Sequence, residues 1–231
     1  MSPDEYCREL EAYLCRKNDG HLIRIVGPSF ERVCGWAAQG IPFRIACQGI
    51  DRYFVRYYAK AGRRRPVHID FCEADVLDVF DAWRRAVGVR LPGTGHDDDS
   101  AKRRPGMRAH LDGVLEKITG RLTSARPLGA HLKQVLESIA DEVTSLAQVA
   151  EPVRGEARAR ISVRLSELDQ IMLDAVRGEV DSGSLPEIQR EAQEELAPFR
   201  ERMDDEAFRQ ALNLAIGRLL REQEKLPVIT L

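Results

Sequence analysis

Residues 91–106, near the middle of the chain, lack the apolar periodicity of a helix or a strand. They are rich in glycine, proline and charged residues, which cannot bury enough apolar surface to fold by themselves. We therefore expect a flexible linker at 91–106 between two domains, residues 1–90 and residues 107–231.

Both domains are expected to be mainly α, because apolar residues recur at helical spacing between glycine and proline breaks. In the amino-terminal domain, two short β-branched runs form either a two-stranded element or extended connectors. In the carboxyl-terminal domain, we expect a helical bundle or an extended hairpin. The predicted helices cover 3–17, 28–40, 42–61 and 71–87, then 107–124, 128–150, 154–178, 185–197 and 204–225, and the β-branched runs are 21–26 and 66–70. The apolar tail 226–231 either folds back on the bundle or adds as a strand to a partner.

Charge is distributed unevenly along the chain. Residues 1–92 carry a net charge of +3 and residues 109–231 carry −6, although the whole chain has only −2. This asymmetry indicates two surfaces with different partners. We expect the acidic half to recruit another protein or to self-associate as a homo-oligomer.

The five cysteines all fall in the first domain, and no pair has the CxxC spacing. An odd number without paired spacing favours reduced, buried thiols over a disulfide framework or a zinc site. No apolar stretch approaches the length of a membrane span. We therefore expect a cytoplasmic protein without a membrane partner.

Catalytic motifs are missing from the sequence: it contains no GxxxxGK[ST], GxGxxG, HExxH or GxSxG pattern. The five histidines are scattered, and the acidic run at 97–99 lacks the alternating spacing of a calcium loop. We expect no cofactor, no metal and no enzymatic activity, with an enzyme of unfamiliar site as a remote alternative.

Residues 44–65 depart most clearly from an ordinary mixed-charge surface, because seven basic residues face a single acid, Asp51. Cations that recur every four residues form one stripe on a helix, and such a stripe suits a row of phosphates. The aromatic residues between them either fill the core or stack on bases. The candidate nucleic-acid contacts are Arg44, Arg52, Arg56, Lys60, Arg63, Arg64, Arg65, Tyr57 and Tyr58.

The run 29–50, SFERVCGWAAQGIPFRIACQGI, followed by 75–83, DVLDVFDAW, resembles the helical domain of the primosomal replication-initiation proteins DnaD and DnaB. In that family the last helix carries the pattern YxxxIxxxW. Val79 and Trp83 lie at its Ile and Trp positions, and Asp75 replaces the Tyr. The resemblance covers residues 28–87 and implies a compact helical module that binds single-stranded or remodelled DNA. It adds Trp83 to the candidate contacts, whereas the position of Trp83 in the apolar register of a helix favours a core residue.

These observations predict a non-enzymatic nucleic-acid-binding accessory protein of DNA replication or repair. Its partners would be DNA, single- or double-stranded, and a protein bound by the acidic half. The alternative is a helical adaptor or assembly factor whose basic patch meets an acidic protein surface.

Overall fold

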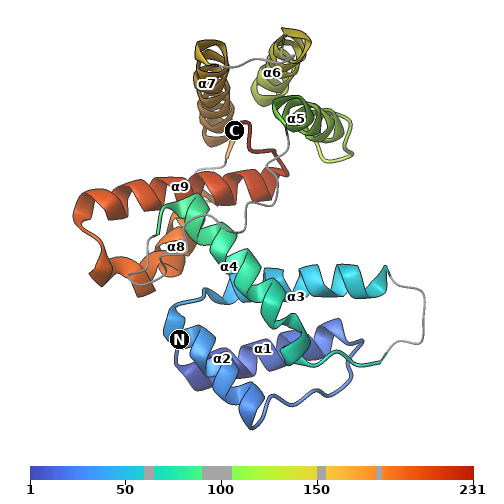
Figure 1. Ribbon diagram of the computed structural model, residues 1–231, viewed down its shortest axis with the longest axis vertical. Helices are drawn as coiled ribbons and strands as arrows, with labels where there is room; N and C mark the ends of the chain where they lie inside the picture. The colour runs from blue at the N-terminus through green and yellow to red at the C-terminus, as the bar shows by residue number, and fades with distance from the viewer. Residues whose placement is uncertain (60–64, 90–105, 150–154, 181–183) are drawn as a thin grey trace. The chain divides into compact units, whose positions relative to one another are not determined.

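The computed structural model describes residues 1–59, 65–89, 106–149, 155–180 and 184–231 (Figure 1). Its regular elements are α-helices and two short 3-10 helices, so the predicted mainly α class is confirmed. The predicted linker, apart from Gly106, lies outside the described residues. None of the described helices is long and apolar enough to cross a membrane.

The chain divides into two compact units. The first unit comprises residues 1–90 together with 195–211, and the second comprises 91–194 together with 212–231. A segment of the carboxyl-terminal half therefore belongs to the amino-terminal unit, which the division at the linker did not anticipate.

The first unit is built from helices whose ends carry clear local signals. Ser2 and Glu5 form a capping box at the start of the first helix, and Gly40 and Gly88 end two others in the left-handed conformation. The elements are α1 (Pro3–Lys17), α2 (Pro28–Gln39), α3 (Phe43–Tyr58), η1 (Ile69–Cys72), α4 (Glu73–Val87), η2 (Ala197–Arg202) and the first turns of α9 (Asp205–Glu224).

The crossing of α3 and α4 lies at the centre of this unit (Figure 1). Gly49 is required there, because a Cβ at this position would collide with the backbone of Val76. The core of this unit includes Leu10, Ile45 and Ile50, all fully buried. The absence of a side chain at Gly49 thus lets the backbones of α3 and α4 approach closely at their crossing.

The two β-branched runs do not form a two-stranded element. Residues 21–26 and 65–68 have no strand pairing, and the buried side chain of Asn18 provides a link to the second run instead. Its amide nitrogen donates to the carbonyl oxygens of Val67 at 3.0 Å and Leu14 at 2.9 Å, while its oxygen accepts from the Val67 N–H at 2.7 Å. One side chain therefore satisfies backbone groups that a neighbouring strand would otherwise pair.

Replacing Asn18 with alanine is expected to lower the free energy of unfolding by about 1–2 kcal/mol, because the backbone groups of Val67 lose their buried partner. Urea denaturation followed by circular dichroism measures the change. His21→Ala, an exposed substitution nearby, is the control and should change little. Equal stability of the two variants would contradict a structural role for the Asn18 amide.

The second unit is built around three consecutive helices, in which α6 packs against both α5 and α7. It also contains most of α8 and the last turns of α9. The helices agree with the predicted ranges within a few residues. Their bounds are α5 (Met107–Leu122), α6 (Ala130–Val149), α7 (Glu156–Glu179) and α8 (Ser184–Leu196).

The apolar tail folds back onto the second unit. Leu226 and Ile229 are buried, and the Ile229 N–H donates to Asp169 Oδ1 at 3.1 Å. The His110 Nε2 lies 2.9 Å from the Ile229 carbonyl oxygen. Asp169 is held in turn by Arg221. These contacts favour the fold-back alternative over a strand offered to a partner.

The cysteines are free thiols, and three of them are buried: Cys7, Cys47 and Cys72. Burial raises the pKa of Cys47 and of Cys72 to about 12, and raises that of Cys7 to about 11. These three thiols therefore stay protonated near neutral pH and pack as small apolar side chains.

Candidate nucleic-acid interface

The arginine stripe of α3 faces carboxylates that α4 supplies. Asp75, only 2% exposed, pairs with both Arg52, at 3.2 Å, and Arg56. Asp78 pairs with Arg52 as well, at 3.3 Å. Two of the predicted phosphate ligands are thus engaged within the folded unit, and they join α3 to α4.

The remaining predicted cations are placed less uniformly. Arg44 is half-buried in the first turn of α3 and has an interaction partner in the folded chain. Arg65 is exposed, and its backbone N–H and carbonyl oxygen both bond to the Tyr57 hydroxyl, at 2.8 and 2.9 Å. Lys60, Arg63 and Arg64 lie outside the described residues.

Tyr58 contributes to the core side of α3 rather than to an open surface. Its hydroxyl donates to the Lys17 carbonyl oxygen at 3.1 Å, and its ring packs on Phe54 at a centroid distance of 5.6 Å. The half-buried ring therefore connects α3 to the end of α1. Tyr58 therefore has a structural role in the first unit.

Trp83 is inaccessible to a base, contrary to the prediction from the family resemblance. The residue is 3% exposed, and its Nε1–H donates to Glu195 at 3.1 Å. Its ring packs against Phe80 and against Phe199 of η2, with centroids at 5.7 and 5.6 Å. The tryptophan is a core residue at the junction of the two segments that form the first unit.

The structure adds one residue that the sequence did not reveal as a contact, Phe71. It is 59% exposed, although its ring stacks on Tyr53 at 6.4 Å with an angle of 15° between the planes. Tyr53 stacks in turn on Tyr57 at 6.0 Å and 17°. We call these three residues the aromatic stack. Phe71 was assigned to the start of a predicted helix, where no pattern separates an exposed ring from a buried one.

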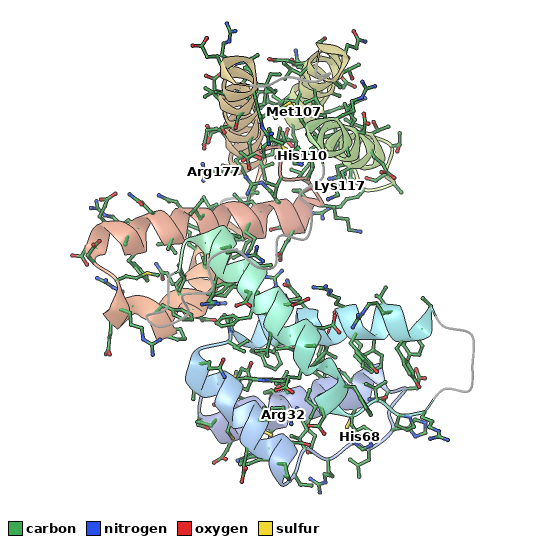
Figure 2. The ribbon with its side chains drawn as sticks, viewed as in Figure 1. Arg32, His68, Met107, His110, Lys117 and Arg177 are labelled. Atoms are coloured by element: carbon green, nitrogen blue, oxygen red, sulfur yellow. The ribbon has the colours of Figure 1, made fainter. Side chains whose placement is uncertain are left out.

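The charge around the aromatic stack is nearly balanced among the described residues. Arg56 lies 6.0 Å from the Tyr53 ring centroid, in a cation–π arrangement, and Arg65 is bonded to Tyr57. On the other side, Asp70 accepts from the Ser29 hydroxyl and pairs with Arg32, which also binds Glu73. Figure 2 labels Arg32 on α2 and His68, an exposed side chain just before η1. Arg56 and Arg65 are thus the two described arginines with a contact to a ring or hydroxyl of the aromatic stack.

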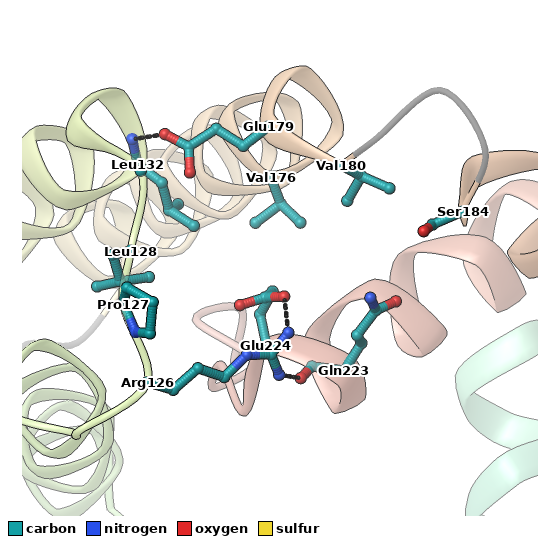
Figure 3. Close-up of a pocket in the computed structure, with 11 residues that line it drawn as sticks. Arg126, Pro127, Leu128, Leu132, Val176, Glu179, Val180, Ser184, Gln223 and Glu224 are labelled. Carbon is teal, nitrogen blue, oxygen red and sulfur yellow. Dashed lines mark hydrogen bonds and ion pairs between the residues drawn. The ribbon is translucent and has the colours of Figure 1, made fainter.

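A cavity of about 220 Å³ in the second unit offers a different kind of site (Figure 3). Its polar groups already serve the fold. Glu179 accepts from the Leu132 N–H at 2.6 Å and so caps the start of α6, while Glu224 pairs with Arg126 at 2.8 Å and with Arg121 at 2.7 Å. Among the described residues, no group of three or more His, Cys, Asp or Glu side chains is arranged to hold a metal ion.

Comparison of the chain with protein-family models, curated proteins and solved structures found no match. The resemblance to the DnaD and DnaB domain therefore stays a prediction. The candidate site is defined by its own geometry: an exposed ring on a parallel stack, with two arginines beside it.

Proposed function

We propose that this chain is a non-enzymatic nucleic-acid-binding accessory protein, acting in DNA replication or repair, whose contact surface is centred on the aromatic stack. The observation that supports it best is the exposure of Phe71. One ring face lies against Tyr53 while most of the residue remains open to solvent. A base can lie on such an open face whatever its sequence, because every base has a π-face.

Phosphate contacts make a smaller contribution in this proposal than the sequence suggested. Arg52 and Arg56 share Asp75, so each must weaken an internal ion pair in order to bind a phosphate. Arg65 is exposed, and its backbone N–H donates to the Tyr57 hydroxyl of the aromatic stack. For roughly one to three phosphate contacts on a single strand, the logarithm of affinity falls with the logarithm of salt at a slope of about −0.7 to −2.

The acidic half supplies the second part of the proposal. Residues 109–231 carry a net charge of −6, which repels nucleic acid and favours a protein partner. The chain thus connects a nucleic acid held at the aromatic stack to a protein recruited by the acidic half. The adaptor alternative retains the protein partner and replaces the nucleic acid with an acidic protein surface.

Replacing Phe71 with alanine is expected to weaken oligonucleotide binding by about tenfold, since one base–aromatic stack contributes about 1–3 kcal/mol. Fluorescence anisotropy with a labelled mixed-sequence oligonucleotide, single-stranded and duplex, measures the affinity. The melting temperature should change little, because the side chain is largely exposed.

Two matched variants separate stacking from other effects. Phe71→Leu keeps an apolar side chain but removes the aromatic face, so it should behave like Phe71→Ala. Val55→Ala removes another exposed apolar side chain of the same unit and should bind like the unsubstituted protein. If the unsubstituted protein binds neither single strands nor duplex at low salt, the nucleic-acid proposal is wrong and the adaptor alternative remains.

A further inference from the structure

The segment between α1 and α2 has the side-chain alternation of a β-strand, although it belongs to no sheet. Ile23 and Ile25 are buried, whereas Leu22 and Val26 are 76% and 66% exposed and the Arg24 side chain is 70% exposed. Side chains that alternate with a period of two indicate an extended backbone with one face on the core. Leu22, Arg24 and Val26 therefore share the outer face.

The two edges of this segment differ in their hydrogen bonding. The Ile23 N–H donates to Cys15 Sγ at 3.2 Å, the Cys15 thiol donates to the Ile23 carbonyl oxygen at 3.5 Å, and the Ile25 N–H donates to Glu11 at 2.8 Å. All three bonds bring α1 side chains to one edge. In an extended chain the backbone groups of alternate residues point to opposite edges. The groups of residues 22, 24 and 26 point to the second edge, where no bond is found among the described residues.

We propose that residues 21–26 are a docking edge at which a partner protein adds an extended peptide as a β-strand. An unpaired row of backbone N–H and C=O groups is a template for such addition. The backbone pairing supplies affinity, and the alternate side chains supply specificity. This inference is independent of nucleic-acid binding by the aromatic stack.

The outer face of the edge specifies the chemistry of the peptide. Arg24 lies between two apolar side chains, and among the described residues its one carboxylate contact, with Glu11, is long at 3.5 Å. A complementary strand therefore carries an acidic residue flanked, two positions away on each side, by apolar residues. A second copy of this chain is a poor occupant, because antiparallel pairing centred on Arg24 would place two arginines opposite each other.

The test uses the full chain and the acetylated, amidated peptide Ser-Val-Thr-Glu-Thr-Val-Ser, with Ser-Val-Thr-Lys-Thr-Val-Ser as its control. Amide chemical shifts in a ¹⁵N-labelled sample report which backbone groups bind. The amides of Leu22, Arg24 and Val26 should shift most, and the Glu peptide should bind about fivefold more tightly than the Lys peptide. The preference should reverse in the Arg24→Glu variant.

A pair of variants at one position tests the backbone directly. Val26→Pro removes an N–H from the free edge and should abolish binding, whereas Val26→Thr keeps the N–H and should retain it. The proposal is overturned if millimolar Glu peptide shifts none of these amides. It is equally overturned if binding survives Val26→Pro, or if the charge preference is unaffected by Arg24→Glu.

Discussion

Replacing Phe199 with alanine is expected to lower the free energy of unfolding of the first unit by about 3–5 kcal/mol, the largest effect we expect from a single substitution. Phe199 is 1% exposed, and its ring lies 6.4 Å from Phe80 and 5.6 Å from Trp83. Removing it takes one ring from a buried cluster of three. Urea denaturation followed by tryptophan fluorescence measures the loss, because Trp36 and Trp83 both belong to this unit.

The matched control is Phe208→Ala, because Phe208 is a half-buried ring of the same unit that lies beneath Arg200. We expect a loss of about 1 kcal/mol there, since less apolar surface is removed from the interior. If Phe199→Ala is no more destabilising than Phe208→Ala, residues 195–211 do not complete the core of the first unit. Residues 1–90 would then form an independent domain, as the sequence suggested.

The close fit of η2 explains why residues 1–90 are expected to be unstable alone. Gly40 has a φ of +80° and leaves no room for a side chain, since a Cβ there would lie 2.9 Å from the Pro198 Cβ. Glu195, buried in the same region, accepts the Trp83 indole N–H. Without residues 195–203, Trp83 would lose both an aromatic neighbour and its hydrogen-bond partner.

Helix positions could be predicted because their signals are local. Pro28 starts a helix, Gly40 and Gly88 end helices with a left-handed residue, and Ser2 with Glu5 caps the first turn. Each signal acts within a few residues of the end that it defines. A single sequence is therefore sufficient to place most of the helices, and with them the mainly α class.

The partners of the charged and aromatic residues could not be predicted in the same way. Counting charges over residues 44–65 finds one acid, but the carboxylates that engage Arg52 and Arg56 come from Asp75 and Asp78 on the next helix. Trp83 meets a partner 112 residues away along the chain. Such pairs depend on how the helices cross. The role of Gly49 at the α3–α4 crossing likewise depends on Val76, whose backbone leaves no room for a Cβ at this position.

The exposure of apolar residues was the least predictable feature, because it too depends on contacts distant in the sequence. Phe71 and Leu22 are apolar, and apolar residues are usually assigned to the core. Their exposure follows from the connections on either side: η1 turns the Phe71 ring outward onto Tyr53, and Cys15 and Glu11 hold the inner edge of residues 21–26. The docking edge and the exposed ring of the aromatic stack therefore both lie on connections between α-helices, residues 21–26 and η1.

Replacing Asp75 with alanine is expected to have opposite effects on stability and on nucleic-acid binding. The buried carboxylate holds two guanidinium groups, so its loss should lower the free energy of unfolding by about 2–4 kcal/mol. This loss of stability is smaller than that expected for breaking a fully buried ion pair, because the Arg52 and Arg56 side chains are partly exposed. The two released arginines become available to phosphates, so the affinity for a single-stranded oligonucleotide should rise and the salt slope should steepen by about 1.

The same substitution at Asp78 is the control, because this carboxylate also pairs with Arg52 but is exposed, whereas Asp75 is buried. Asp78→Ala should change the free energy of unfolding by less than about 0.5 kcal/mol and the salt slope by little. Anisotropy titrations at several salt concentrations, at a temperature where both variants are folded, measure the slopes. A slope unchanged by Asp75→Ala would contradict the prediction that Arg52 and Arg56 bind phosphate. Binding would then depend on the aromatic stack and on cations other than these two arginines, because freeing their guanidinium groups had added no phosphate contact.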